Sequence, residues 1–174
     1  ELRAALARGV PPAELADEVP LARHVVEETL RLYPPLPSLT RTALAPLRLG
    51  DYRIDAGDVL VFSPWVTQRD PRFFPEPERF DPWRFAGERR RQSIGDAYFP
   101  FGAGPRICVG NHFALLEVAI IVALATLQVT LRLERDDEPA MAPLNVLRCR
   151  DGLCVTVRGQ PQPTIGGAFT PQAR

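Results

Sequence analysis

The sequence predicts a mainly α-helical protein with small antiparallel β-sheets, and three observations lead to this fold class. Two long segments repeat apolar residues at helical spacing, and several short segments alternate between turn residues as strands do. Between them lies a stretch rich in proline and aromatic residues that follows neither period. The 174 residues, 45% of them hydrophobic, are enough to bury a core. The 19 prolines, about twice the usual share of roughly 5%, keep the helices few and sharply bounded.

The two principal helices are predicted over residues 21–33 and 111–128. Pro20 suits the first turn of the earlier helix, and Pro34-Pro35 ends it because proline does not continue a helix. The later helix is strongly apolar, which is typical of a buried helix, with apolar residues at Phe113, Leu116, Ile120, Ile121, Leu124 and Leu127. We therefore expect it to be the most buried element of the fold.

Short alternating segments bounded by turn residues predict the strands. They lie at residues 47–49, 52–54, 59–62, 129–133, 144–150 and 153–157. The first three form an antiparallel group, and Asp151-Gly152 is predicted to join the last two as a hairpin. This hairpin would place Cys149 and Cys154 opposite each other, as reduced strand residues in preference to a disulfide.

Residues 64–105 are predicted to form a packed meander, because their aromatic side chains need burial. These side chains are Trp65, Phe73, Phe74, Phe80, Trp83, Phe85, Phe99 and Phe101. No internal repeat and no domain boundary interrupt residues 1–158, which are predicted to form one unit. Residues 159–174, rich in Pro, Gln, Gly and Thr, predict a disordered tail.

Composition narrows the class of protein. The 21 basic and 21 acidic residues give no net positive field, which disfavours nucleic acid as a partner. The longest uncharged apolar run, residues 118–125, is far shorter than the roughly 20 residues of a membrane span. Three cysteines exclude a disulfide scaffold and indicate a reducing, cytoplasmic compartment. The only methionine is Met141, so we expect the chain to be part of a longer protein. A membrane anchor in the part that precedes this chain is left as an alternative.

A glycine-rich loop carrying Cys108 lies immediately before the second predicted helix. A cysteine at that position meets unpaired backbone N–H groups and the positive end of the helix dipole, both of which favour a thiolate, and a thiolate is a metal ligand. Glycines let the backbone approach a flat partner closely. Phe101 can shield the sulfur from water, and Arg106 can reach an anionic group at the partner's edge.

Elimination limits the metal that Cys108 could bind. No second Cys or His clusters with it, which excludes a tetrahedral zinc or iron–sulfur site, and no Cys-x-x-Cys-His run is present for covalent c-type haem. A single axial thiolate to a non-covalent haem iron remains, with an inert buried cysteine as the alternative. His112, one turn along the helix, is expected to point away, and His24 is expected at the surface of the first helix.

Three motifs in order give the chain a family resemblance. The pattern Phe-x-x-Gly-x-Arg-x-Cys-x-Gly is matched at every fixed position by Phe101, Gly104, Arg106, Cys108 and Gly110. In this pattern the chain resembles the C-terminal part of a cytochrome P-450, a haem-thiolate monooxygenase. Glu28-Thr29-Leu30-Arg31 resembles the Glu-x-x-Arg of that family's K helix, and Pro77-Glu78-Arg79-Phe80 resembles the Pro-Glu-Arg-Phe of its meander. The resemblance covers about residues 12 to 158, so it implies that residues 1–158 are the C-terminal part of one haem-thiolate domain.

The resemblance implies a cofactor, haem b (iron protoporphyrin IX), and a set of residues that bind it. Cys108 would be the axial thiolate, the metal ligand and the catalytic residue. The other cofactor-binding residues would be Phe101, Gly102, Gly104, Arg106, Gly110 and Arg41. Arg41 and Arg106 are assigned to the two haem carboxylates, although a strand-edge surface cation is the alternative for Arg41. Glu28, Arg31 and Arg79 would form a buried triad that supports the meander, with a solvated pair and a surface cation as the alternative.

The implied reaction is an O₂- and electron-dependent oxidation of a hydrophobic substrate, with electrons from a ferredoxin or flavoprotein reductase. Residues 36–40 and 140–145 resemble segments that border the substrate pocket in this family. Arg89-Arg90-Arg91 is either a solvated charge run or an aid to docking the electron donor. The family's oxygen-activating helix is not found in this chain, so we expect the chain alone to bind haem poorly and to be inactive. A haem-thiolate peroxygenase or isomerase, and a non-catalytic truncated chain, remain as alternatives.

Overall fold

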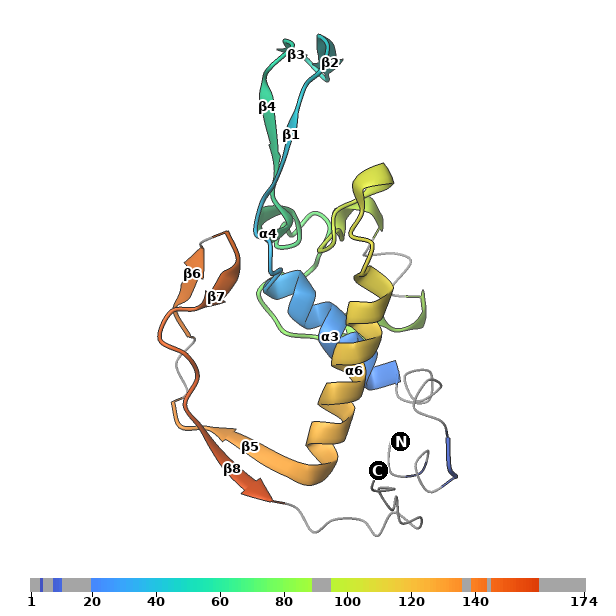
Figure 1. Ribbon diagram of the computed structural model, residues 1–174, viewed down its shortest axis with the longest axis vertical. Coiled ribbons are helices and arrows are strands. Elements are labelled where there is room, and N and C mark those ends of the chain that lie inside the picture. Colours follow the sequence, from blue (N-terminus) through green and yellow to red (C-terminus); the bar gives the residue numbers. More distant parts are fainter. Residues whose placement is uncertain are drawn as a thin grey trace, which may run out of the picture.

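Two helices lie against each other at the centre of the computed structural model (Figure 1). They are α3, Pro20–Leu32, and α6, Asn111–Gln128, which confirms both predicted helices to within one residue. The structure describes residues 4, 8–10, 20–88, 95–135, 139–143 and 145–159. The buried residues of α6 are Ala119, Ala123 and Leu127. Because they are four residues apart they form one stripe, whose two small side chains permit a close approach to α3.

The first residues of α3 and the residues after it define its ends. Pro20 occupies the first turn, where its missing N–H needs no partner. Arg31 lies in the last turn, beside the negative end of the helix dipole. The Tyr33 N–H still donates to the Thr29 carbonyl at 2.7 Å, and Pro34 then stops the helix.

Four short strands extend from the body as a finger (Figure 1). β2, Leu47–Leu49, pairs with β3, Tyr52–Ile54, in the predicted hairpin. β4, Val59–Phe62, pairs antiparallel with β1, Leu39–Thr42, with Leu39 opposite Phe62. The three predicted strands are confirmed, but they do not form one group, because β4 pairs with β1 and not with the β2–β3 hairpin. β1 was not predicted, because four residues directly after a proline-rich segment show too little alternation.

The strands near the C-terminus pair differently from the prediction. β5, Val129–Leu133, pairs with β8, Val155–Gly159, and β6, Met141–Pro143, pairs with β7, Leu147–Cys149. The predicted hairpin across Asp151-Gly152 is therefore wrong. β7 and β8 each form hydrogen bonds with an earlier strand, and the Asp151-Gly152 turn links the two separate ribbons.

The two cysteines beside this turn consequently belong to different ribbons. Cys149 faces Met141 in the β6–β7 ribbon. Cys154 precedes β8, and its carbonyl accepts a hydrogen bond from the Glu134 N–H at 3.1 Å. Both are free thiols, and the predicted cross-strand placement of the pair is wrong.

Short helical turns shape the segment between the finger and α6. They are α4, Pro64–Thr67, and three 3₁₀ turns, η1, Pro82–Phe85, η2, Gly95–Ala97, and η3, Gly104–Arg106. The Ser63 hydroxyl caps α4 by accepting from the Val66 N–H, and the Asp81 carboxylate caps η1 by accepting from the Trp83 N–H. This segment is a defined irregular structure that packs on α3 through η1.

A small aromatic core lies inside this segment. Phe74, Phe85 and Ala97 are buried together, with Tyr98 packed against them at 5.1 Å between the Phe85 and Tyr98 ring centroids. The prediction that all eight aromatic side chains of the segment are buried holds for Phe74 and Phe85 alone, while Trp65, Phe99 and Phe101 are half-buried. Phe73, Phe80 and Trp83 are exposed in this chain.

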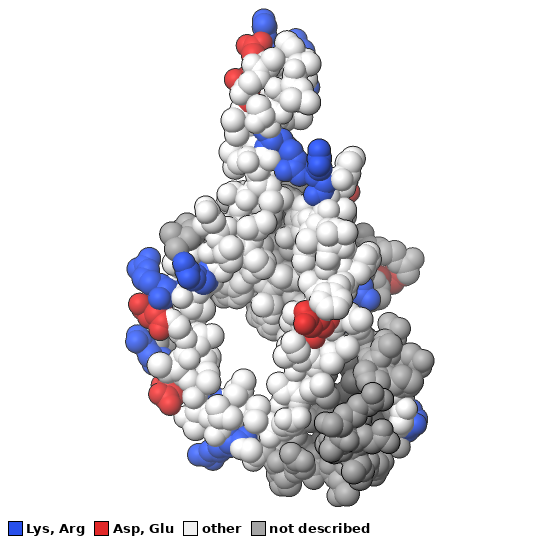
Figure 2. Space-filling view, viewed as in Figure 1, with Lys and Arg blue, Asp and Glu red and all other residues white. Residues whose placement is uncertain are grey.

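The exposure of α6 contradicts the prediction that it is the most buried element. Its exposed apolar side chains are Phe113, Leu116, Val118, Ile121 and Leu124. Figure 2 shows an opening through the molecule that is bordered largely by uncharged side chains. Apolar surface of this extent is typical of a face that contacts further protein. An apolar helix is typical of a protein core, but its sequence does not show which residues cover it.

By length and composition alone, α6 is also the one described helix that could cross a membrane, with a mean hydropathy of 1.6. This is weak evidence for a span, since the core helix of a soluble protein meets the same test. Arg89-Arg90-Arg91 and residues 160–174, which include nearly all of the predicted tail, lie outside the described residues.

Phe74 and its neighbour Phe73 provide a matched test of the small core. We expect Phe74→Ala to lower the free energy of unfolding by about 3–5 kcal/mol, because this 0% exposed ring leaves a cavity when removed. Phe73→Ala, at 44% exposed, should cost about 1 kcal/mol or less. Urea unfolding of the complete protein measures both, and equal losses for the two variants would contradict this core.

Candidate functional site

Cys108 lies in the loop between η3 and α6, and its side chain is exposed. Backbone hydrogen bonds define the loop around it. The Cys108 N–H donates to the Phe101 carbonyl at 3.0 Å, and the Ile107 N–H donates to the Gly104 carbonyl at 3.0 Å. The Cys108 carbonyl accepts from the Asn111 N–H at 3.3 Å. These bonds position the sulfur at the start of α6, where the helix dipole is positive.

Glycine is needed at two positions of the loop. Gly102 and Gly104 have φ angles of +76° and +68°, which L side chains rarely adopt. Gly102 is also buried against β1, because a Cβ there would lie 3.5 Å from the Leu39 Cδ1 atom. Any larger residue at position 102 would strain the backbone because of the positive φ angle, whereas its Cβ would only touch the Leu39 side chain. The loop and β1 are therefore held in contact.

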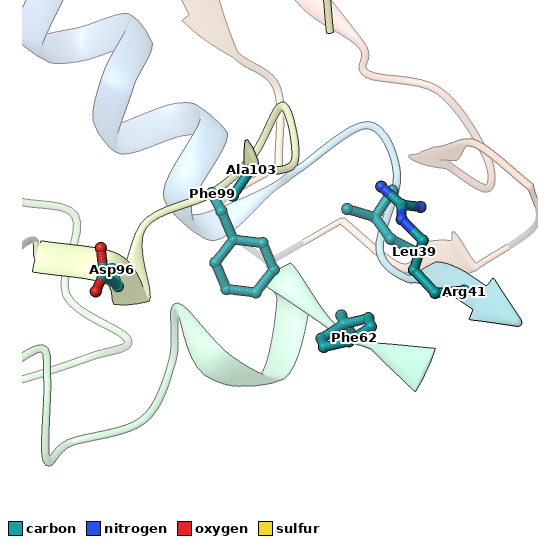
Figure 3. A pocket seen from close by; sticks show the side chains of 6 residues that line it. All are labelled: Leu39, Arg41, Phe62, Asp96, Phe99 and Ala103. Atoms are coloured by element: carbon teal, nitrogen blue, oxygen red, sulfur yellow. The ribbon is translucent and has the colours of Figure 1, made fainter. Parts of the chain in front are cut away.

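A pocket of about 270 Å³ lies where β1 meets this loop (Figure 3). Its lining residues are Leu39, Arg41, Phe62, Asp96, Phe99 and Ala103. Four of the six are apolar, and the two charged residues, Arg41 and Asp96, lie on opposite sides of the Phe99 ring in Figure 3. Its mostly apolar lining suits an apolar group, and Arg41 is available to an anion at its edge.

The two arginines assigned to the carboxylates lie on neighbouring segments. Arg41 is an exposed residue of β1, and its Nη1 donates to the Thr40 carbonyl at 2.8 Å. Arg106 is an exposed residue of η3, two positions before the cysteine. No side chain of the described residues forms an ion pair with either guanidinium. Both remain able to bind an anion supplied from outside this chain.

A fully buried ion pair lies beneath the meander. The Arg31 Nε and Nη2 donate to the Glu28 carboxylate at 2.7 and 2.9 Å, and both side chains are 0% exposed. The Arg31 guanidinium also donates to the carbonyls of Gln68 at 2.8 Å and Arg79 at 3.2 Å. Glu28 accepts a further hydrogen bond from the Asp81 N–H at 2.8 Å. The pair thus joins α3 to three points of the meander, which matches the predicted supporting role of Glu28 and Arg31.

The predicted role of the Arg79 side chain is wrong. Its guanidinium is 64% exposed and pairs with Glu76 at 3.1 Å, outside the buried cluster. Only the Arg79 backbone carbonyl touches the pair. The second buried cation next to Glu28, besides Arg31, is Arg84 of η1. Its Nε lies 3.5 Å from the Glu28 Oε1, and its side chain is 4% exposed. The Arg84 Nη1 also donates to the Pro75 carbonyl at 2.8 Å.

A sequence signal for Arg84 was present but ambiguous. Pro-x-Arg-Phe occurs twice, at residues 77–80 and again at 82–85. Only the first copy has Glu in its second position. The structure places the arginine of the second copy, Arg84, inside the protein, because Pro82 begins η1 and η1 packs on α3.

One exposed turn of the meander carries the clearest electrostatic perturbation. Hydrogen bonds from the Arg72 side chain hold the pKa of the Asp70 carboxyl below its ordinary value. The Asp70 carboxylate also accepts from the Arg72 N–H at 2.9 Å. Because this turn is open to solvent, the pair orders the chain after α4 and adds little to stability.

The remaining candidates do not join the site. His112 is exposed in the first turn of α6, and the described residues contain no group of three or more metal-ligating side chains. The segment at 36–40 leads into β1 beside the pocket, whereas 140–145 contributes to the separate β6 strand, with Leu144 outside the described residues. Cys108 therefore remains the single candidate metal ligand at this site.

The residues present fit a haem bound through sulfur. The exposed sulfur offers one ligand, and the exposed apolar side chains of Ile107, Val109 and Phe113 lie within five residues of it in sequence. Gly110 leaves room beside the sulfur, since a Cβ there would lie 4.0 Å from the Cys108 Sγ. Arg41 and Arg106 are exposed cations on the two segments that border this loop. This arrangement is that of the haem-thiolate class of oxidoreductases.

The comparison with protein families agrees with this class. A family model described as Cytochrome P450 matches residues 1–151. The match covers most of the 174 residues, so the chain belongs to the cytochrome P450 family, whose cofactor is haem b.

Curated relatives resemble this chain over most of its length. Cytochrome P450 4X1 of Rattus norvegicus is 36% identical over 150 residues, which are 86% of this chain and 30% of the relative. Taurochenodeoxycholic 6 alpha-hydroxylase of Sus scrofa is 36% identical over 150 residues, 83% of this chain and 29% of the relative. The chain therefore spans about 30% of the length of these relatives.

Solved structures share the fold. A structure described as retinoic acid bound cyanobacterial CYP120A1 is 28% identical with a TM-score of 0.79, and covers 85% of this chain and 34% of its own. The haem domain of cytochrome P450DA is 27% identical with a TM-score of 0.80, and covers 87% of this chain and 34% of its own. The small sheets and few helices described above are therefore part of the cytochrome P450 fold.

The two Pro-x-Arg-Phe copies make a matched test of the buried cluster. We expect Arg84→Leu to lower the free energy of unfolding by about 1–3 kcal/mol, because it removes the second cation beside the buried Glu28 and the donor to the Pro75 carbonyl. Arg79→Leu should cost about 1 kcal/mol or less, since its ion pair is exposed. Chemical unfolding of the complete protein compares them, and a larger loss for Arg79→Leu would restore the original assignment.

Proposed function

We propose that this chain is the cysteine-bearing part of a haem-thiolate monooxygenase that oxidises a hydrophobic substrate. The observation that carries the proposal is the exposed Cys108 sulfur in a hydrogen-bonded glycine loop at the start of α6. The bound haem supplies the activation of O₂ from which one oxygen atom enters the substrate. The activity belongs to the complete protein, because this chain spans about 30% of its curated relatives.

Each residue of the site has a part that follows from its position. Cys108 holds the iron through sulfur, and the loop hydrogen bond from its N–H to the Phe101 carbonyl keeps the sulfur in place. Phe101 shields the sulfur from water. Gly102, Gly104 and Gly110 keep the loop close to a flat partner. Arg41 and Arg106 bind the two haem carboxylates.

The lining of the pocket supports a hydrophobic substrate. Leu39 and Phe62 present apolar side chains from the paired strands β1 and β4, next to the cysteine loop. One relative is named as a hydroxylase of a taurochenodeoxycholic compound, and one solved structure holds retinoic acid, both of them largely apolar molecules. We infer a substrate of the same broad kind.

The oxidation needs O₂ and two electrons in addition to the substrate. An electron-donor protein, either a ferredoxin or a flavoprotein reductase, is the proposed source of the electrons.

Two further predictions concern the whole chain. We expect residues 1–158 to form one unit, and we expect the protein to be cytoplasmic.

Replacement of Cys108 tests the iron ligand directly. We expect Cys108→Ser in the complete protein to abolish the thiolate-type band in the carbon monoxide difference spectrum, because a hydroxyl does not replace the sulfur ligand. Cys149→Ser and Cys154→Ser are matched controls and should leave the spectrum unchanged. A wild-type protein without the thiolate-type band would refute the proposed function and favour the non-catalytic alternative.

Replacement of Arg41 tests the haem carboxylate assignment. We expect Arg41→Gln to speed haem loss to apomyoglobin by about tenfold, because a charge-assisted hydrogen bond to a carboxylate is lost. Arg53→Gln, on β3 with an exposed partner Asp55, is the control and should change the rate little. Equal rates for both variants would make Arg41 the surface cation of the alternative assignment.

A further inference from the structure

Gln68 is a buried amide in which every polar group of the side chain has a partner. The residue is 0% exposed and follows α4 directly. Its Nε2 donates to the carbonyls of Leu30 at 3.1 Å and Arg31 at 3.0 Å. Its Oε1 accepts from the Phe99 N–H at 2.9 Å. Its backbone carbonyl accepts from the Arg31 guanidinium at 2.8 Å.

These bonds connect segments that are far apart in sequence. Leu30 and Arg31 are in the last turn of α3, where carbonyl groups have no partner within the helix. Phe99 is the residue from which the chain enters the cysteine loop. The Gln68 amide nitrogen therefore donates to two helix carbonyls that lack a partner within the helix. Its amide oxygen accepts from the Phe99 N–H at the entrance of the loop.

Backbone hydrogen bonds continue from the loop entrance to the cysteine. The Phe99 carbonyl accepts from the Gly102 N–H at 2.9 Å, and the Phe101 carbonyl accepts from the Cys108 N–H at 3.0 Å. The Phe99 side chain meanwhile lines the pocket in Figure 3. The backbone of one residue, Phe99, is thus held by Gln68 while its ring faces the candidate site.

We propose that Gln68 is a positioning residue for the cysteine ligand. It fixes the Phe99 backbone relative to α3. The backbone hydrogen bonds of the loop then determine where the Cys108 sulfur lies relative to Phe99. The inference rests on the proposed function and deepens it, because it adds a residue outside the cysteine motif that determines whether the sulfur stays on the iron.

The chemistry of the amide explains why this residue is suited to the role. The site requires two donors toward helix carbonyls and one acceptor toward an N–H, which a neutral primary amide supplies. A carboxylate has no donor for the carbonyls, and an aliphatic side chain leaves all three partners unsatisfied. A side chain that only fills the volume of Gln68 therefore does not hold the Phe99 backbone.

The test compares Gln68→Met with Val26→Ala in the complete haem-loaded protein. Methionine keeps similar bulk and removes the three side-chain hydrogen bonds. Val26→Ala makes a cavity at a buried position of α3 without removing any of the three Gln68 side-chain hydrogen bonds, and serves as a control for a general loss of stability. Both variants are measured at a denaturant concentration and temperature at which each is folded by circular dichroism.

We expect Gln68→Met to lower the fraction of haem with the thiolate-type carbon monoxide band at least threefold, while Val26→Ala keeps the wild-type fraction. Amide exchange in residues 98–108, which needs no haem, should be about tenfold faster in Gln68→Met than in Val26→Ala. An unchanged band together with unchanged exchange would overturn the inference. A wild-type protein without the band would instead refute the proposed function, and the exchange measurement would still show whether Gln68 holds the loop.

Discussion

The buried pair of Glu28 and Arg31 is the interaction on which the rest of this structure depends. Both charges are removed from water, so each must be fully hydrogen bonded, and the partners that satisfy them come from the meander. The pair therefore constrains the meander to one path across α3. That path brings Tyr98 and Phe99 beside the same helix, where the Tyr98 hydroxyl donates to the Glu27 carbonyl at 3.0 Å. The cysteine loop begins from this fixed point.

The helices and the cysteine loop could be predicted from the sequence because their signals are local. Helical periodicity with prolines at both ends determines α3, and apolar residues at helical spacing determine the extent of α6. The loop is recognisable because glycine, arginine and cysteine are needed at fixed offsets. Strand partners are non-local, so the pairing of β7 with β6 and of β8 with β5 could not be read from the turn between them.

The errors concerning burial have a similar cause. Arg79 and Arg84 occur in the same short pattern, and only packing against α3 distinguishes the exposed one from the buried one. The exposed apolar surface of α6 reflects a core to which this chain contributes only one side. Gln68 carries no sequence signal at all, because its importance comes from three partners that are distant along the chain.

The alanine stripe of α6 has a consequence for the depth at which the sulfur lies. Ala119 and Ala123 are buried side chains of α6, which packs on α3, and Cys108 precedes α6 by three residues. Small side chains permit a close approach of packed helices, and bulkier side chains at these positions would push α6 away from its neighbours. Position 119 is about 12 Å along the axis from the first residue of α6, at 1.5 Å per residue. A substitution at position 119 or 123 would therefore displace the start of α6, and with it the attached Cys108 loop, although the substituted residue is remote from that loop.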